Sequence, residues 1–248
     1  MVFIQNALYF AWSDIRARYK SSILGPYWLT IGNLIGVLGL SLVWANLLHE
    51  SMQTFVPSLT IGMIVWQLVG GVIAEAPATF VRQAGIIKNV IVPIWFFVFR
   101  LVSRHLINFL HNALIIVGVL WYFDIALTPV FMLAAPGFLL VILNLFWLVY
   151  ILGMAGARFR DLEYLINAFL PLLFFLSPVI FRPDHFPVTM DIIWLNPVTY
   201  CIEAIRSPFL GHAPEARVYY FLSSILVAGI MVSYVLNRLV GRRLAFWI

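Results

Sequence analysis

Six long stretches of the chain contain no Asp, Glu, Lys or Arg, and their hydrophobic residues run continuously rather than in alternation. These stretches are residues 21–49, 51–74, 105–123, 125–157, 164–181 and 218–237. About 20 mainly apolar residues cross the hydrocarbon core of a bilayer as a helix. A helix is favoured because lipid offers the backbone no hydrogen-bond partners. The pattern predicts an all-α integral membrane protein with six transmembrane helices, near residues 28–48, 56–75, 100–122, 131–155, 163–181 and 218–237.

The first residues, 3–20, carry a different pattern, in which hydrophobic side chains recur at helical spacing among polar and basic ones. The hydrophobic positions are Phe3, Ile4, Ala7, Leu8, Ala11, Trp12, Ile15 and Tyr19. This spacing predicts a basic amphipathic helix in the membrane interface, which ends where Gly25-Pro26 turns the chain into the bilayer. Such a helix serves either as a simple anchor or as a lever that touches a cytoplasmic partner, and the pattern favours neither.

The segment 76–99 mixes prolines and basic residues with isoleucines and valines. It is too polar to span a membrane and too apolar to extend into water, so we expect a short helix docked against the protein. An exposed apolar patch of this kind usually marks a partner site.

The segment 182–217 is the longest stretch outside the predicted spans, and it contains five prolines. Within it, Asn196-Pro197 reads as a helix N-cap followed by a first-turn proline, which predicts a short helix through about Arg206. Because the segment is also rich in Ile, Val and aromatic residues, we expect it to dip into the outer leaflet rather than form a soluble domain.

Lys and Arg lie mainly on one side of the predicted spans, 12 against 3. The positive-inside rule therefore predicts that both termini are cytoplasmic. The chain of 248 residues is 63% hydrophobic and 10% charged, whereas soluble domains are roughly 25% charged. This composition excludes a soluble enzyme or nucleic-acid-binding domain despite the net charge of +5. The single cysteine, Cys201, excludes an internal disulfide framework, and we interpret it as an apolar filler.

The motifs of several chemistries are absent from the sequence. There is no Gly-x-x-x-x-Gly-Lys-Ser/Thr phosphate loop, so the chain cannot itself be an ATPase of that class, and no His-Glu-x-x-His or Gly-x-Ser-x-Gly occurs. The five histidines show no metal-ligand spacing, and we expect no metal. The spans also lack a central carboxylate, since Glu75 and Asp124 lie at span ends. Ion-coupled carriers usually keep such a group, so its absence argues against a secondary transporter.

Polar residues recur every four positions at the start of the third predicted span: Arg100, Arg104, Asn108 and Asn112, flanked by His105 and His111. Steps of four stay roughly on one helix face. In one interpretation the arginines extend to the cytoplasmic surface and the amides bond neighbouring helices. In the other, this face lines a path for a polar, anionic substrate, with Arg100, Arg104 and His111 at its cytoplasmic entrance.

Aromatic residues make up 16% of the chain. Most are expected in interfacial belts or facing lipid. A minority is suited to a carbohydrate path, because sugars present CH-rich faces to aromatic rings. The candidates for such a path are Tyr27, Trp28, Trp44, Trp66, Phe174 and Phe175.

An ordered set of motifs resembles the polysaccharide-export permeases of the ABC-2 transporter type. The set begins with Arg18-Tyr19-Lys20-Ser21-Ser22-Ile23-Leu24-Gly25-Pro26-Tyr27-Trp28-Leu29-Thr30. It continues with Phe99-Arg100-Leu101, Phe109-Leu110-His111-Asn112, Arg158-Phe159-Arg160-Asp161-Leu162, Leu176-Ser177-Pro178-Val179 and Asn196-Pro197. The motifs cover nearly the whole chain in order.

This resemblance implies a single transmembrane domain over residues 1–248 in the bacterial inner membrane. It further implies a homodimer bound to two copies of a separate ATPase, which holds the ATP and Mg; this chain would carry no cofactor. The resemblance also implies an interface helix at 3–20, a coupling helix in the 76–93 loop and two short re-entrant helices in 182–217. Within the loop, the candidate coupling residues are Arg82, Gly85 and Lys88.

The sequence thus predicts a non-enzymatic permease subunit that exports a lipid-linked polysaccharide of the O-antigen or capsule type. One alternative is an ABC-2 permease for a small hydrophobic drug or lipid. Another is an integral-membrane glycosyl- or acyltransferase, which would need a carboxylate or histidine constellation at a membrane face that the sequence does not offer.

Overall fold

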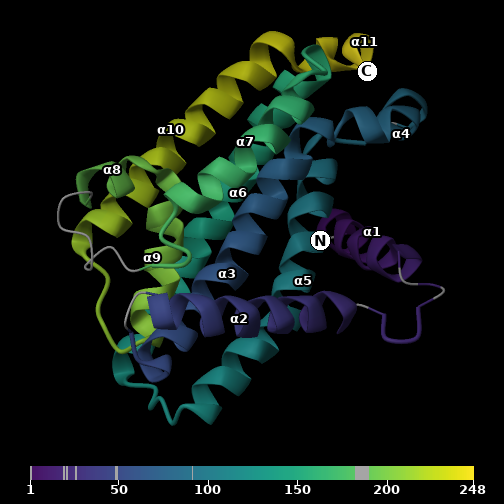
Figure 1. Ribbon diagram of the computed structural model, residues 1–248. Helices are drawn as coiled ribbons and strands as arrows, with labels where there is room; N and C mark the ends of the chain where they lie inside the picture. Colours follow the sequence, from purple (N-terminus) through teal and green to yellow (C-terminus); the bar gives the residue numbers. More distant parts are fainter. Residues whose placement is uncertain are drawn as a thin grey trace.

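The computed structural model describes residues 2–18, 20, 22–25, 27–47, 50–90, 92–181 and 190–248, and the regular elements in these ranges are all helical (Figure 1). The longer helices are α1 Val2–Arg18, α2 Tyr27–Leu47, α3 Met52–Glu75, α5 Trp95–Tyr122, α6 Ala134–Arg158, α7 Leu162–Leu176, α9 Pro197–Phe209 and α10 Ala216–Val240. The short elements are η1 Ala76–Ala78, η2 Val81–Gln83, α4 Ala84–Asn89, η3 Pro129–Leu133, α8 Met190–Leu195, η5 Gly241–Arg243 and α11 Leu244–Trp247. The predicted all-α membrane class is confirmed.

Five helical stretches in the described part of the chain are long and apolar enough to cross a bilayer. They are Tyr27–Ala45, Met52–Ala78, Trp95–Tyr122, Pro129–Arg158 and Ala216–Val240. The remaining predicted span, 163–181, corresponds to α7, whose 15 residues extend only about 22 Å at 1.5 Å per residue. A bilayer core is about 30 Å thick, so the sixth crossing stays a prediction. The helix of the third predicted span, α5, begins at Trp95 rather than near residue 100, and Phe96 in its first turn packs against Phe10 of α1.

Helix α3 is the centre of the bundle. In its most apolar window 72% of the residues are buried, whereas the corresponding share in the other four long stretches is 17–39%. It contacts α2, α5, α6, α7 and α9. The other helices therefore pack one side against α3 or its neighbours and keep a wide apolar surface for lipid, as expected of a membrane bundle.

The backbones approach one another closely at glycines. A Cβ added at Gly62 of α3 would lie 2.8 Å from the carbonyl oxygen of Val179, and side chains at Gly137 and Gly156 of α6 would collide with the backbones of α9 and η1. Small residues permit such contacts in membrane proteins, where close van der Waals packing replaces the hydrophobic effect between helices.

Helix α1 packs along α5 through one stripe of its surface, made by Ala7, Ala11 and Ile15, which are buried. The larger residues Leu8 and Trp12 of the predicted apolar set are exposed. The stripe consists mostly of alanines because they let the two helices approach closely, and the large side chains stay available to another surface. The helix is confirmed, its interfacial position stays a prediction, and Tyr19 lies outside the described residues.

Helix α9 begins as predicted, with the Asn196 side chain accepting a hydrogen bond from the Val198 backbone N–H at 3.0 Å. It continues beyond Arg206 to Phe209 and packs against α3, α6 and α10. Most of its residues are buried, including Cys201. In α9, the apolar side chains that suggested contact with the outer leaflet are thus buried against other helices of the protein. A re-entrant position in the membrane stays a prediction, and residues 182–189 of that segment lie outside the described residues.

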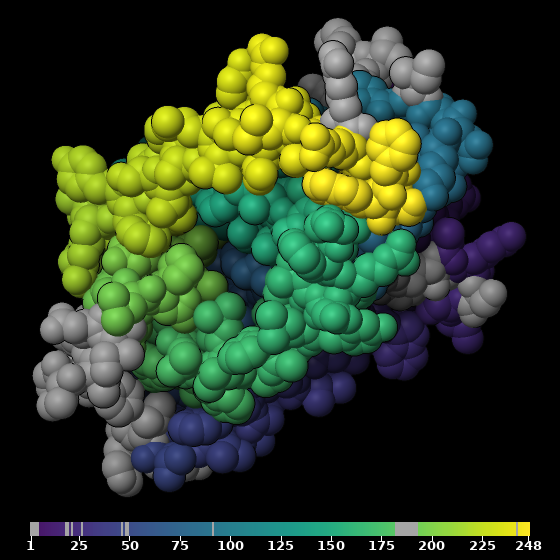
Figure 2. Space-filling model, turned by 90° about the horizontal axis from the view of Figure 1, so that it is seen from above, coloured from purple at the N-terminus to yellow at the C-terminus, as the bar shows by residue number. Residues whose placement is uncertain are grey.

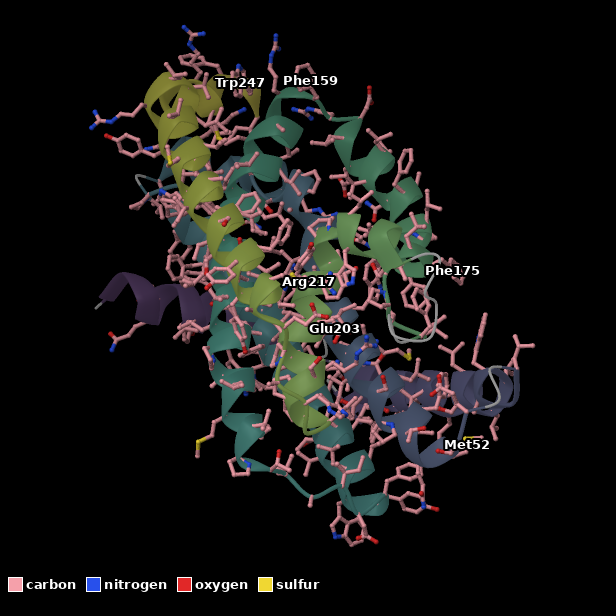
Figure 3. All side chains as sticks on the ribbon, turned by 90° about the vertical axis from the view of Figure 1, so that its left-hand side faces the viewer. Met52, Phe159, Phe175, Glu203, Arg217 and Trp247 are labelled. Atoms are coloured by element: carbon pink, nitrogen blue, oxygen red, sulfur yellow. The ribbon has the colours of Figure 1, made fainter. Side chains whose placement is uncertain are left out.

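The segment α4 lies beside α11 at one end of the bundle, at the top of Figure 1, and η3 lies at the opposite end. We refer to the end formed by residues 81–89 and 244–247 as the α4 end. Figure 2 looks onto it, and Figure 3 places Phe159 and Trp247 there, with Met52 far from both. The sequence predicted a short helix in the segment 76–99, and α4 is that helix.

Candidate transport and coupling site

Three of the aromatic candidates lie together beside α3. The rings of Trp66 and Phe174 meet edge to face with centroids 5.4 Å apart. Trp44 and Phe174 both pack against the same buried cluster, which includes Phe55 and Leu59. Helices α2, α3 and α7 therefore contribute one aromatic group, which we call the Trp66 cluster (Trp44, Trp66 and Phe174).

The remaining aromatic candidates are Tyr27, Trp28 and Phe175, of which Phe175 borders the Trp66 cluster. Tyr27 contacts the ring of His111 edge to face, with centroids 6.1 Å apart, and so joins the start of α2 to the middle of α5. Trp28 and Phe175 are exposed. The Phe175 ring meets that of Phe174 edge to face with centroids 5.4 Å apart and projects from one side of the molecule (Figure 3). The predicted path residues therefore do not form a single lining in this chain.

Arg100 of α5 forms a forked contact with Asp14 of α1. Its Nε donates to Oδ2 at 2.7 Å and its NH2 group to Oδ1 at 2.5 Å, while NH1 donates to Oε1 of Gln83 in η2 at 3.1 Å. The guanidinium also lies 5.4 Å from the centroid of the Phe10 ring. One side chain thus connects α1, α5 and η2, which sequence spacing alone did not reveal.

Glu75, the last residue of α3, is the centre of a second group of charges. It pairs with Arg104 of α5, lies 3.7 Å from the NH1 group of Arg82, and lies 3.4 Å from Nε2 of His105. Arg82 also pairs with Glu163 of α7 at 2.6 Å. Four helical elements, α3, η2, α5 and α7, are therefore tied together at the α4 end.

The coupling candidates occupy different environments. The Arg82 side chain is half exposed although it belongs to this charge network. Gly85 and Lys88 of α4 are exposed, and no residue of α4 is buried. Docking of this helix against the protein was expected, and Ala84 and Ile87 pack against the core, whereas Ile86 and Val90 are exposed. Because six residues offer only one narrow face, α4 leaves most of its surface open to a partner.

Carboxamides join three helices inside the bundle. Asn33 of α2 and Gln67 of α3 exchange hydrogen bonds through their side chains, with Asn33 Nδ2 donating to Gln67 Oε1 at 2.6 Å. Asn112 of α5 donates to the same Gln67 oxygen at 3.3 Å. Of the two interpretations given for the polar residues that recur every four positions on α5, hydrogen bonding to neighbouring helices therefore describes Asn112.

Two motifs that are distant in sequence meet at the end of α7. Asn196 donates to the hydroxyl of Ser177 at 2.8 Å, and Arg206 donates to the carbonyl of Pro178 at 2.6 Å. Arg206 is almost fully buried and is neutralised by Glu203 one turn away. Irregular backbone is tolerated inside a membrane protein where other protein groups satisfy it, and Asn196 and Arg206 do so here.

The side chains that sequence reasoning missed are the acidic and amide partners: Asp14, Glu75, Gln83, Glu163, Asn33 and Gln67. The sequence feature that pointed to the acidic partners is the small number of charged residues. A membrane chain with only 10% charged residues rarely places a carboxylate near an arginine without pairing the two. Within the described ranges, no three residues of the His, Cys, Asp and Glu types are arranged to hold a metal ion.

A family model described as "ABC-2 type transporter" matches residues 6–210. The chain is 23% identical to the O-antigen export system permease protein RfbA of Klebsiella pneumoniae over 224 residues, which are 90% of this chain and 85% of that protein. It is 22% identical to the permease protein RfbA of Myxococcus xanthus over 225 residues, covering 86% of this chain and 84% of that protein.

Proposed function

Since the chain belongs to the ABC-2 type transporter family, we propose that it is the permease subunit of an ATP-driven exporter of a lipid-linked polysaccharide. It is a multi-pass protein of the bacterial inner membrane. The observation that carries the proposal is that relatives named O-antigen export permeases match it over 86–90% of its length. The cargo is then a glycan of the O-antigen or capsule type, carried from cytoplasm to periplasm.

The energy comes from a separate ATPase, which binds ATP and Mg, and the working assembly contains two copies of each chain. The absence of a phosphate loop from this sequence supports the assignment of ATP hydrolysis to a separate chain. The exposed surface of α4, with Gly85 and Lys88, is the contact we assign to the ATPase. This assignment places the α4 end and both termini in the cytoplasm, in agreement with the distribution of Lys and Arg.

A displacement of α4 is transmitted to the bundle through two polar side chains of η2, the neutral Gln83 and the charged Arg82. Gln83 accepts a hydrogen bond from Arg100, which in turn pairs with Asp14 of α1. Arg82 pairs with Glu163 of α7 and lies near Glu75 of α3. Ion pairs of this kind repack when packed helices change between two arrangements. We therefore infer that α1, α3 and α7 are the elements that the ATPase moves.

The arginines act in this scheme mainly as coupling residues. Arg100 and Arg104 are already paired with Asp14 and Glu75, so a pyrophosphate-linked lipid at the cytoplasmic entrance would have to displace a carboxylate before it could bind them. His111, which contacts Tyr27, is the remaining candidate for the entrance.

The glycan path itself is assigned to the Trp66 cluster and to the exposed Trp28 and Phe175, which a second copy of the chain would bring together. Aromatic faces pack against the CH-rich faces of sugars, and their spread over α2, α3 and α7 suits a long polymer rather than a single bound molecule.

A specific observation favours a second candidate, a permease for a small hydrophobic drug or lipid. Two apolar cavities of about 590 and 660 Å³ flank α5, one against η3 and α9 and the other against α2. Drug-sized ligands occupy pockets of about 300–1,000 Å³, so both cavities have a suitable size.

Depletion of the protein in its own host distinguishes the two functions. Loss of a polysaccharide exporter causes lipid-linked polymer to accumulate in the cytoplasmic leaflet while surface polymer disappears. A drug or lipid permease leaves the polymer unchanged and alters sensitivity to hydrophobic compounds. Complementation with wild type and with a Trp66→Ala variant, at matched abundance, separates loss of the path from loss of the protein.

A further inference from the structure

Buried polar atoms without a hydrogen-bond partner are concentrated on one part of α5. Among the described residues seven such side-chain atoms occur, and four of them belong to residues 104–112. These four are Arg104 Nε, Asn108 Oδ1, Asn112 Oδ1 and His105 Nε2, of which His105 Nε2 lies 3.4 Å from the Glu75 carboxylate without forming a hydrogen bond to it. Asn112 is only 4% exposed, and the His105 side chain is 11% exposed. A concentration of this kind on two turns of one helix points to a common partner.

The polar face of α5 lies opposite α3, and the two helices match in steps of four residues. Arg104 contacts Glu75, Asn112 contacts Gln67, and the residue midway on α3 is Gly71. A Cβ added at Gly71 would lie 2.9 Å from Cε1 of His105, so the absence of a side chain there makes room for the ring. We call this interface the α3–α5 seam; it consists of Gln67, Gly71, Glu75, Arg104, His105, Asn108 and Asn112.

The chemistry of the seam specifies its ligand. Two of the atoms, the amide oxygens of Asn108 and Asn112, only accept hydrogen bonds, Arg104 Nε only donates, and a histidine nitrogen does either. A small molecule that both donates and accepts satisfies all of them, whereas a simple anion or cation satisfies only some. Buried polar groups in native proteins almost always have partners, which include ordered water.

The space available narrows the choice further. A cavity of about 50 Å³ lies at the α4 end of the seam, where Glu75 and Arg104 are the two seam residues that line it, together with Asp14, Thr79 and Arg100 among others. One water needs at least about 10–15 Å³ by this measure. The cavity therefore holds a few waters, and a sugar ring is too large for it.

We propose that the α3–α5 seam binds a short file of water molecules, which enters at the cavity beside Glu75 and Arg104 and extends to Asn112. The waters donate to the two asparagine oxygens and accept from Arg104 Nε. They keep the charged group around Glu75 hydrated although it lies between packed helices, and they allow α3 and α5 to shift without leaving polar atoms unpaired. The proposal does not depend on which substrate the protein carries.

Cysteine accessibility tests the water file. The native Cys201, the only cysteine in the chain, is replaced by Ala, and single cysteines are introduced at Asn108, Asn112 and Ile116. Ile116 is a matched control, because it is buried one turn beyond Asn112 on α5 and its replacement also shortens the side chain. The purified protein in proteoliposomes is treated with the small water-soluble reagent methanethiosulfonate ethylammonium.

Methanethiosulfonates react with hydrated thiolate, which apolar surroundings suppress, so we expect Asn108→Cys and Asn112→Cys to react about tenfold or more faster than Ile116→Cys. Equal rates at the three positions would overturn the proposal. Fast reaction at position 108 alone would show that the waters do not extend to Asn112, which would overturn that part of the proposal.

A second variant locates the waters in the seam. Gly71→Ala in the Asn108→Cys background places a methyl group against His105, so labelling should slow severalfold. Gly118→Ala is the matched control, because nothing lies within 4 Å of a Cβ added at Gly118, and labelling should not change. Unchanged labelling in a well-assembled Gly71→Ala variant would contradict this location, and the comparison with Ile116→Cys stands without it.

Discussion

Replacing Asp14 with Asn separates the two roles considered for Arg100, because the partner changes while the arginine stays. The guanidinium makes bonds of 2.7 and 2.5 Å to the Asp14 carboxylate. Asn keeps the shape but offers one acceptor oxygen and no charge. If Arg100 bound the substrate, release from Asp14 would preserve or raise export. If Arg100 links α1 to α5, as we infer, Asp14→Asn lowers both export and stability.

The size of the effect follows from this geometry. A hydrogen bond to a charged group contributes about 1.5–3 kcal/mol and a neutral one about 0.5–1.5 kcal/mol. Asn loses one charged bond and weakens the other, and the pair is only partly buried, with side-chain exposures of 15% for Arg100 and 25% for Asp14. Partial exposure lowers the gain from an ion pair, so we expect a loss of about 1–2 kcal/mol. This corresponds to roughly a 5–30-fold change in the equilibrium between packed and released α1.

A double-mutant cycle measures this energy. Asp14→Asn, Arg100→Gln and the double variant are compared with wild type for thermal unfolding of the purified protein and for glycan export at matched abundance. A direct pair gives a coupling energy of about 1–2 kcal/mol, with the double variant less impaired than the sum of the single ones. Additivity within about 0.5 kcal/mol, or full export by Asp14→Asn, would refute the link. Arg100→Lys is less informative, because Lys cannot reproduce a fork on either carboxylate or phosphate.

Three further predictions concern contact, packing and capping. Gly85→Asp or Lys88→Asp on the exposed α4 should abolish stimulation of the ATPase by the permease while membrane insertion stays normal, and normal stimulation would place the contact elsewhere. Gly62→Ala should lower the melting temperature by an amount equivalent to about 1–3 kcal/mol, because the added Cβ overpacks the bundle, whereas Gly118→Ala should leave it unchanged; equal melting temperatures would contradict the close approach. Asn196→Ala should cost about 1 kcal/mol as a lost helix cap, and a wild-type unfolding curve would show that the cap contributes nothing.

The elements that the sequence predicted well are those set by local pattern. Charge-free runs located the long helices because a charge in the bilayer core is costly. Asn196-Pro197 located the start of α9 because the cap and the fixed proline φ act within one turn. The short α7 was not foreseen, since its apolar run continues through Ser177-Pro178 although the helix ends at Leu176.

The partners of the arginines depend on tertiary structure and were beyond the reach of spacing. Asp14 and Arg100 are 86 positions apart, and Arg82 and Glu163 are 81 apart. Their pairing depends on how α1 and α7 pack against the α4 end. The aromatic candidates show the same limit, because composition selected Trp66 and Phe174 but could not separate them from the exposed Phe175.

Reconstitution tests the central claim, that this chain exports a lipid-linked polysaccharide by using a separate ATPase. Inside-out proteoliposomes contain the chain, the ATPase that co-purifies with it and the lipid-linked polymer, and transport is measured as protection of the polymer from an external glycosidase. We predict protection only when both proteins and hydrolysable ATP are present, with none in the presence of a non-hydrolysable analogue. Equal protection by the chain alone without ATP would contradict the account.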